Sequence, residues 1–439
     1  MPAHQIIAAA PIHDSPLMTK REWAEKMMGS VRPPQLANVR RSRGALRKGM
    51  EDAKRIVEDG STSPLVSDHY TGSKSSAFLD QVFRDQKTIG RGSFGEVFSV
   101  RSLEDGGLYA VKMSSRELRQ TSPLKYREAV NHMVLPRHPN ILGFVQAWED
   151  VGRLYIQTEL AEQSLLAFCS AGVSEDQVWH FAIDILRAVD HLHAHRMIHC
   201  DIKTENILVT KGSICKLADF GLATRLDKPQ EMESAEEGDS RYLAKEVLNG
   251  KPTMSSDVFS AGMTILEIAT DLVLPGNGDG WDDIRNWRIP DRFFHSRSEE
   301  LKELTRRMLS IVPEMRPTTQ QLFEFPGIKK RLEGREEYVK TAEMKRLADA
   351  ENKKEDEEKP TTTPTLGMIT PPRITPQTPK KTSVKKDSKS TPFPKKLKLE
   401  DSDDEEDPYS PLVRRSLNRR KLPEARRTLF SKGDEEEEE

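Results

Sequence analysis

The chain has 439 residues, which is enough for two or three domains. Hydrophobic residues make up 36% and charged residues 31%, so we expect that the chain does not pack along its whole length. The formal net charge of -2 gives no overall attraction to nucleic acid or to an anionic membrane. The three cysteines form no C-x-x-C pair, which argues against a disulfide framework or a cysteine zinc site and suits a reducing compartment.

Residues 1–80 are rich in Ser, Pro, Arg and Lys, and no sustained amphipathic period organises them. The composition predicts a mostly disordered regulatory arm, with one or two helical turns around residues 47–58 left open. The first residues, MPAHQIIAAAPIHD, lack a basic region and make a poor signal peptide. No apolar run approaches the ~18 residues that span a bilayer. We therefore expect an intracellular protein in the cytoplasm, the nucleus or both.

Residues 81–332 have the pattern of a folded domain, with strands first and helices later. The β-type runs EVFSV and LYAVKM flank the turn sequence EDGG, which predicts a hairpin. Residues 174–195 predict an amphipathic helix, and Ser174 followed by Gln177 has capping-box spacing at its start. The predicted apolar face consists of Val178, Phe181, Ala182, Ile185, Leu186, Val189 and Leu192. This order indicates an α+β fold with a β-rich small lobe and a helical large lobe.

The stretch IGRGSFGEV, residues 89–97, lies between two predicted strands. Gly90, Gly92 and Gly95, with Val97, give the G-x-G-x-x-G-x-V spacing that lets backbone amides close over nucleotide phosphates. Glycines also serve in plain hairpin turns, so this motif by itself leaves both interpretations open. The strand-turn-strand setting argues against a dinucleotide fingerprint, which opens a helix.

Lys112 follows in YAVKM, on the next predicted strand. A strand lysine preceded by Ala110 and Val111 is typical of the lysine that pairs with nucleotide α- and β-phosphates. A surface lysine would show the same pattern. Glu128, in KYREAVNHM, lies in a predicted helix and could orient Lys112 through an ion pair. An exposed helical glutamate is the alternative.

Two further motifs supply acidic and amide groups. HCDIKTEN, residues 199–206, places Asp201 to accept or orient a substrate hydroxyl proton, Lys203 to contact a transferring phosphate, and Asn206 to hold magnesium. LADFGLA places Asp219 as a second magnesium ligand. Four motifs in this order predict a site that uses ATP and Mg²⁺ as cofactors.

Residues 83–332 resemble a eukaryotic protein kinase domain and, more narrowly, the Wee/Myt family. The narrower match is carried by EGDSRYLAKEVL (237–248), NGDGWDDIR (277–285), QAWED (146–150), LYIQTEL (154–160) and HCDIKTENI, which has no arginine before Asp201. The intact DFG at 219–221 and RSLEDGGLYAVK are more similar to the membrane-associated Myt type. The resemblance implies a bilobal fold and an enzyme that phosphorylates the nucleotide-loop Thr or Tyr of a cyclin-dependent kinase, which restrains entry into division.

The resemblance also implies roles for single residues. Thr158 would be the gatekeeper, and Glu159 would begin the hinge that meets adenine. Glu246 would pair with Arg316, and Asp257 would anchor the catalytic-loop backbone. The predicted nucleotide-binding residues are Ile89, Gly90, Arg91, Gly92, Ser93, Gly95, Val97, Ala110, Lys112, Thr158 and Glu159.

Two positions depart from the usual kinase pattern. Cys200 replaces the arginine that holds a phosphorylated activation loop in many kinases, so we expect an enzyme that does not need this phosphorylation. Thr204 replaces a more usual proline, and the ligands on either side of it are present. Three interpretations of the acidic activation segment QEMESAEEGDSR stay open: it orders itself, it contacts a basic substrate, or it is only a soluble loop.

Residues 333–439 return to low hydrophobicity and are expected to be mostly disordered, with a charged surface helix possible over 333–359. Arg427, Leu429 and Phe430 in RRTLF have the form of a cyclin-docking motif, which also arises by chance. Five threonines and one serine in this region precede proline and are candidate feedback phosphorylation sites or parts of a spacer: Thr363, Thr370, Thr375, Thr378, Thr391 and Ser410.

Two questions stay open at this point. Myt-type kinases are tied to Golgi or endoplasmic reticulum membrane by an apolar segment, and none is found here, so peripheral association is the alternative location. The rival functions are a catalytically weak scaffold that sequesters cyclin–kinase complexes and a serine/threonine kinase with other substrates. The intact Lys112, Asp201, Asn206 and Asp219 argue against the scaffold.

Overall fold

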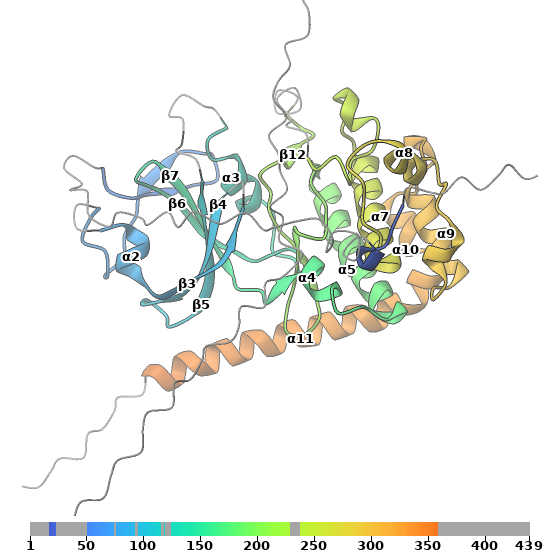
Figure 1. Cartoon of the computed structure of the whole chain (residues 1–439). Coiled ribbons are helices and arrows are strands. Elements are labelled where there is room, and N and C mark those ends of the chain that lie inside the picture. The colour runs from blue at the N-terminus through green and yellow to red at the C-terminus, as the bar shows by residue number, and fades with distance from the viewer. Residues whose placement is uncertain are drawn as a thin grey trace, which may run out of the picture. The chain divides into compact units, whose positions relative to one another are not determined.

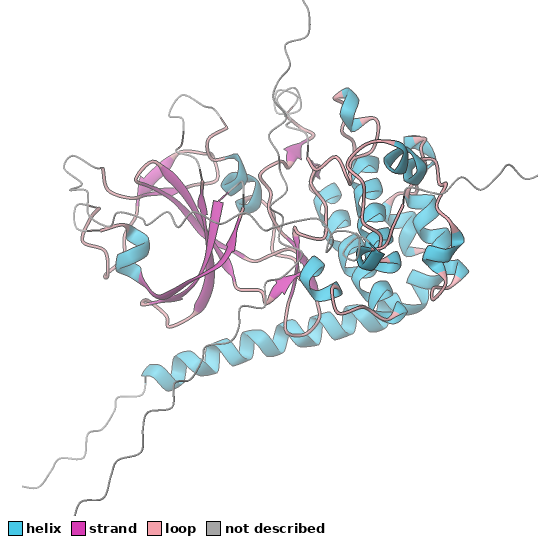
Figure 2. Cartoon of the chain, viewed as in Figure 1, coloured by secondary structure: helices cyan, strands magenta, loops and turns pink. Residues whose placement is uncertain are grey.

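The computed structural model describes residues 17–22, 51–73, 76–92, 95–115, 118, 124–228 and 238–358. Strands dominate the first part of this region and helices the second, and the two parts form two lobes (Figure 1). Figure 2 shows the same division by secondary structure, with the magenta sheet in one lobe and most of the cyan helices in the other. The predicted α+β, bilobal fold is confirmed.

The small lobe is built on a seven-stranded antiparallel sheet with the order β2-β1-β6-β7-β5-β4-β3. The predicted hairpin is present as β4 and β5, whose turn is closed by a hydrogen bond from Ser102 N to Gly107 O (2.9 Å). The elements of this lobe are β1 Lys54–Ile56, β2 Thr62–Pro64, α2 Phe78–Val82, β3 Phe83–Arg91, β4 Gly95–Ser102, β5 Leu108–Ser114, α3 Arg127–Met133, β6 Phe144–Asp150 and β7 Arg153–Glu159.

Part of the predicted disordered arm is instead ordered, and this part of the prediction is wrong. Strand β1 lies between β2 and β6 and pairs with both, so residues 54–56 are extended and not helical. Ile56 is 1% exposed and packs with Tyr126 and Ala129 of the α3 region. Three-residue strands are too short to show a periodic hydrophobic pattern in the sequence. They are ordered because they extend the sheet beyond β6, whose edge would otherwise be exposed.

The large lobe consists mainly of helices around the long helix α5. Its helices are α4 Leu165–Cys169, α5 Glu175–Ala194, α7 Met254–Thr270, α8 Asp279–Arg285, α9 Glu299–Met308, α10 Thr319–Phe323 and α11 Pro326–Glu358. Its short strands are β8 Gln163–Ser164, β9 Met197–Ile198, β10 Ile207–Val209, β11 Cys215–Leu217 and β12 Thr224–Arg225, and its 3-10 turns are η1 Val247–Asn249, η2 Asp291–Phe294 and η3 Pro313–Met315.

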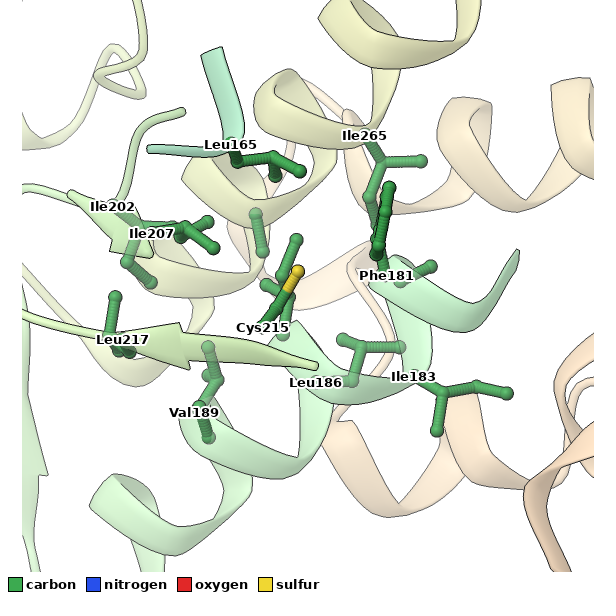
Figure 3. Packing of buried hydrophobic residues seen from close by; sticks show 14 of the residues in the cluster. Leu165, Phe181, Ile183, Leu186, Val189, Ile202, Ile207, Cys215, Leu217 and Ile265 are labelled. Atoms are coloured by element: carbon green, nitrogen blue, oxygen red, sulfur yellow. The ribbon is translucent and has the colours of Figure 1, made fainter. Parts of the chain in front are cut away.

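Helix α5 forms the centre of the largest apolar cluster. The predicted capping box is present, because Ser174 Oγ accepts from Gln177 N (3.3 Å) and Gln177 Oε1 accepts from Ser174 N (2.9 Å). All seven residues of the predicted apolar face are at most 2% exposed. Figure 3 shows Phe181, Leu186 and Val189 of this helix packed with residues from the catalytic-loop region and α7. This core therefore fixes the floor beneath the candidate site.

Helix α11 continues well past residue 332, where the sequence places the end of the folded domain. Its Arg335 donates from Nη2 to Asp184 Oδ2 (2.6 Å) and from Nε to Asp184 Oδ1 (3.0 Å), and the Asp184 side chain is fully buried in α5. Val339 is 1% exposed. Packing therefore extends into the region that the charge pattern marks only as a surface helix. In the described part of the chain, no helix combines the length and apolar character needed to cross a membrane.

Candidate active site

The glycine-rich stretch forms the turn between β3 and β4. Gly90 lies opposite Val97, and Gly92 N donates to Gly95 O (2.9 Å). A Cβ at Gly95 would lie 2.1 Å from the carbonyl oxygen of Met113 on β5, so no side chain fits there. This close approach explains one glycine of the motif by strand packing alone. Ser93 lies outside the described residues.

The other predicted nucleotide-binding residues lie on neighbouring strands of the same sheet. Val97 on β4 is opposite Lys112 on β5, and Ala110 on β5 is opposite Thr158 on β7. Ala110 and Thr158 are buried, whereas Ile89 is 49% exposed. The predicted residues therefore come together on one part of the sheet.

Besides Lys112, two of the predicted nucleotide-binding side chains already have protein partners. The guanidinium of Arg91 contacts Glu96 Oε1 (2.9 and 3.0 Å). The Glu159 carboxylate accepts from Gly143 N (2.6 Å) and lies 2.8 Å from Lys216 Nζ. Glu159 N also donates to Gly143 O (2.9 Å), so the Glu159 side chain and its backbone N–H are both bonded within the protein.

Lys112 links three separate elements. Its Nζ lies 2.7 Å from Glu128 Oε1 on α3 and 3.0 Å from Asp219 Oδ1, which follows β11. Burial disfavours the charged lysine, but the two carboxylates outweigh it and raise the pKa of Lys112 above its ordinary value. Burial acts to raise the pKa of Asp219, and the ammonium of Lys112 outweighs it and lowers that pKa. The contact of Lys112 with Glu128 that the sequence predicts is present, and Asp219 shares the same ammonium. Burial raises the pKa of Glu128, and the charge of Lys112 opposes this rise.

The catalytic loop between β9 and β10 is fixed from α7. Asp257 Oδ2 accepts from His199 N (2.8 Å), and Asp257 Oδ1 accepts from Cys200 N (3.1 Å), as the resemblance implies. Cys200 has a φ of 64°, a left-handed conformation that costs energy for a residue with a side chain. The buried carboxylate of Asp257 therefore holds a strained backbone ahead of Asp201.

The polar residues of this loop converge on the Asp201 carboxylate. Lys203 Nζ lies 2.6 Å from Asp201 Oδ2, and Asn206 Nδ2 donates to the same oxygen (2.8 Å). Asn206 Nδ2 also donates to Asp201 O (2.9 Å), so its amide nitrogen braces the loop. The structure thus brings together three of the residues that the sequence singles out.

The DFG stretch is tied to helix α3. Asn131 Nδ2 donates to Ala223 O (2.7 Å), and Arg127 Nε donates to Gly221 O (2.9 Å). Phe220 is fully buried, and its ring lies 4.5 Å from that of His132 and 5.3 Å from that of His199, centroid to centroid. Asp219 and Glu128 are therefore positioned by one connected set of contacts.

Sequence reasoning missed the role of residues 238–241, which end the activation segment. Asp239 N donates to Asp201 Oδ1 (3.2 Å). A Cβ at Gly238 would lie 2.4 Å from Cys200 O, so this position needs glycine. Arg241 Nη2 contacts Asp239 Oδ2 (2.7 Å) and Glu205 Oε1 (2.8 Å). In the sequence, EGDSRY indicates only a family resemblance, and its Gly-Asp pair is the one local signal of close backbone packing. Residues 229–237, which include most of the acidic residues of the activation segment, lie outside the described residues.

The motif NGDGWDDIR also has a structural role that the sequence did not reveal. Arg285 of α8 is buried and donates from Nη2 to Leu243 O (2.6 Å) and to Ser240 O (3.1 Å). Its guanidinium stacks 3.6 Å from the centroid of the Trp281 ring, and Trp281 Nε1 donates to Ser240 O (2.9 Å). Helix α8 thus fixes the backbone that follows the activation segment.

The predicted pair of Glu246 and Arg316 is present. Arg316 Nη2 donates to Glu246 Oε2 (3.1 Å), and Arg316 Nη1 contacts the other carboxylate oxygen. The Arg316 side chain is 1% exposed, so the pair is well shielded from water. It ties the segment before η1 to the segment after η3.

The donor set suits a magnesium ion that shares its coordination with phosphates. Among the described residues, no group of three or more His, Cys, Asp or Glu side chains could hold a metal by itself. Mg²⁺ is commonly bound through one or two carboxylates plus substrate phosphates and water. The Asp219 carboxylate and the side-chain oxygen of Asn206 fit this requirement.

A scan against family models matches residues 83–327 to the protein kinase domain. The chain belongs to the protein kinase family. The chain is similar to the membrane-associated tyrosine- and threonine-specific cdc2-inhibitory kinase wee-1.3 of Caenorhabditis elegans. The two sequences are 50% identical, and the match covers 75% of this chain and 49% of the relative. The chain is 37% identical to the corresponding kinase wee-1.1 of the same organism, with 70% of this chain and 67% of the relative covered.

The corresponding kinase of Drosophila melanogaster is 38% identical, with 61% of this chain and 50% of the relative covered. The kinase chain therefore belongs to the Wee/Myt group, as its motifs indicate. It spans about half the length of the first of these curated relatives.

Proposed function

We propose that this chain is an ATP- and Mg²⁺-dependent protein kinase that phosphorylates a cyclin-dependent kinase and restrains entry into mitosis or meiosis. The observation that carries the catalytic part is the position of Lys112 Nζ, within 2.7 Å of Glu128 and 3.0 Å of Asp219. Both contacts are expected where a lysine is set to neutralise nucleotide phosphates. The substrate part is supported by the names of the relatives, which describe tyrosine- and threonine-specific cdc2-inhibitory kinases.

In this proposal the small lobe binds the nucleotide. Backbone amides of the turn from Gly90 to Gly95 close over the phosphates, and Lys112 neutralises their charge. Thr158 and the backbone of Glu159 contact the adenine. Magnesium-bound ATP supplies the phosphoryl group together with a metal charge that stabilises the transferring oxygens.

The large lobe orients the acceptor. Asp201 accepts or orients the proton of the substrate hydroxyl, and Lys203 contacts the transferring phosphate. Asn206 and Asp219 hold the magnesium ion. The catalytic work is positioning and charge neutralisation, and the hydrogen bonds from Asp257 and Asn206 keep the Asp201 loop in one conformation.

We further propose that activity does not require activation-loop phosphorylation. Cys200 cannot pair with a phosphate, and burial raises the pKa of its thiol, which keeps it neutral. The end of the segment is held by internal contacts instead, from Asp239 N to Asp201 and from Arg241 to Glu205. A phosphate is therefore not needed to order these residues.

The carboxyl-terminal part of the chain is proposed to bring substrate to the site. Arg427, Leu429 and Phe430 form the candidate cyclin-docking motif, which lies outside the described residues. A docked cyclin would raise the effective concentration of its kinase partner near Asp201. Phosphorylation of the Thr-Pro sites by that partner would give feedback, because each phosphate adds nearly two negative charges.

Phosphoryl transfer by the purified full chain tests the catalytic proposal. Wild type, Asp201→Asn and the control Lys251→Met, whose lysine is exposed, are incubated with labelled ATP, Mg²⁺ and a cyclin-bound kinase, and binding of the complex is measured in parallel. We expect transfer by wild type and Lys251→Met, and none by Asp201→Asn, although all three bind the complex. If wild type binds as tightly as Asp201→Asn and also transfers no phosphate, the chain is a scaffold and the proposal is wrong.

A further inference from the structure

A short stretch near the amino terminus lies against the large lobe. Residues 17–22, here called the docked segment, come well before residue 83, where the family match begins. Thr19 forms an antiparallel bridge with Leu272, at the end of α7. Lys20 N donates to Asp271 O (2.9 Å), and Val273 N donates to Met18 O (3.1 Å). The docked segment is the dark blue turn in Figure 1.

Side chains reinforce this backbone pairing. Leu17 is 3% exposed and belongs to an apolar cluster with Met263, Leu266 and Leu272. Thr19 and Glu22 cap the following turn reciprocally, because Thr19 N donates to Glu22 Oε2 (2.7 Å) and Glu22 N donates to Thr19 Oγ1 (3.1 Å). The docked segment is therefore held by apolar burial and backbone hydrogen bonds and has a stable local conformation.

The Lys20 side chain reaches a buried carboxylate. Lys20 Nζ lies 3.2 Å from Glu267 Oε1, and the two side chains are 13% and 4% exposed. Among the described residues, no other cationic side chain forms an ion pair with Glu267. A buried carboxylate without a cation is costly, and Lys20 supplies the cation that offsets this cost.

Glu267 in turn holds the two segments that frame the site. Its Oε2 accepts from Tyr242 Oη (2.6 Å) and from Thr204 Oγ1 (3.0 Å). Thr204 lies between Asp201 and Asn206 in the catalytic loop, and it is fully buried. Tyr242 ends the activation segment, and its hydroxyl lies 3.1 Å from Thr204 Oγ1. One carboxylate thus joins the catalytic loop to the activation segment.

We propose that the docked segment is an intramolecular ligand of the large lobe, and that Lys20 is a positioning residue that acts through Glu267 on Thr204 and Tyr242. The Lys20 ammonium holds the Glu267 side chain in place, so that Glu267 Oε2 stays within hydrogen-bond distance of both hydroxyls. Loss of Lys20 weakens both hydroxyl contacts and loosens the catalytic loop. The effect on catalysis rests on the proposed function, whereas the effect on loop protection does not.

Amide hydrogen exchange of the full chain, without nucleotide or substrate, tests the structural part. We compare wild type, Lys20→Met, Lys20→Arg and the control Lys251→Met, whose exposed lysine lies elsewhere on the large lobe. We expect exchange over residues 199–206 and 238–243 to become roughly tenfold faster in Lys20→Met. Lys20→Arg and Lys251→Met should match wild type. Leu17→Ser, which undocks the segment without touching Lys20, should reproduce the loss.

Two results would overturn the proposal. One is unchanged exchange in both Lys20→Met and Leu17→Ser. The other is a uniform rise over the whole large lobe, because the segment would then be a general brace and not a support for the catalytic loop. If the chain proves to be a kinase, Lys20→Met should lower kcat with little change in the KM for ATP, and Lys20→Arg should restore kcat. A chain that transfers no phosphate would leave the exchange result intact, so the two failures are distinguishable.

Discussion

Replacement of Arg335 by methionine should strongly destabilise the large lobe. In the native structure the Asp184 carboxylate, which is fully buried, accepts two bonds from Arg335 (2.6 and 3.0 Å) and one from Cys215 N (2.8 Å). The substitution leaves a buried carboxylate with a single amide partner. Removal of one member of a buried pair costs about 3–5 kcal/mol of the free energy of unfolding. By contrast, Arg306→Met breaks an exposed pair with Glu303 and should cost at most about 1 kcal/mol.

Urea unfolding of the full chain measures both losses. Burial raises the pKa of Asp184 even beside Arg335, and loss of the guanidinium should raise it further. A carboxyl with a raised pKa in the folded state stabilises at low pH and loses that contribution as pH rises. The loss in the free energy of unfolding caused by Arg335→Met should therefore be smallest under acidic conditions and should grow as pH rises. Asp184→Asn should partly rescue it. Equal midpoints for Arg335→Met and Arg306→Met would refute the claim that folding extends past residue 332.

Three further predictions concern the small lobe. Lys112→Met should lower phosphoryl transfer roughly 10²–10³-fold without a shift in melting temperature of more than a few degrees, because one preorganised charge is lost; an active variant would exclude its proposed role. Ile56→Ala should cost about 2–5 kcal/mol in denaturant unfolding, against at most about 0.5 kcal/mol for the exposed Val66→Ala, and equal losses would contradict the packing of β1 on α3. Burial lowers the pKa of His132 to about 4, so the unfolded chain takes up the proton first and stability should fall as pH drops from about 6.5 to about 4. His132→Asn should flatten that fall, and an unchanged slope would contradict the account.

Long-period and motif-based features of this chain were predictable from its sequence. The apolar face of α5, from Val178 to Leu192, repeats over about four turns, and its capping box is local, so neither depends on distant residues. Lys112, Asp201, Asn206 and Asp219 are predictable because phosphoryl transfer needs these residue types in this order. Their spacing predicts a common site, and the structure brings Lys112 and Asp219 within 3.0 Å.

The features that the sequence did not reveal depend on partners far along the chain. Strand β1 has three residues, and its order depends on pairing with β6 and β2 and on the burial of Ile56. The docked segment carries Leu17 and Lys20, whose partners lie about 250 residues later, and no local pattern predicts such pairing. Thr204 looked like a neutral replacement, although its hydroxyl donates to Glu267. Charge alone marked α11 as a surface helix, while Arg335 in fact reaches a buried aspartate.

The substrate is the central claim, and mapping of the phosphorylated residue tests it most directly. The full chain is incubated with ATP, Mg²⁺ and a cyclin-bound kinase whose own catalytic aspartate is replaced, and the product is analysed by mass spectrometry, with Asp201→Asn as the control. We predict phosphate on threonine or tyrosine in the nucleotide loop of the cyclin-dependent kinase, with none from Asp201→Asn. Transfer to serine on unrelated proteins, with none to that loop, would contradict the account.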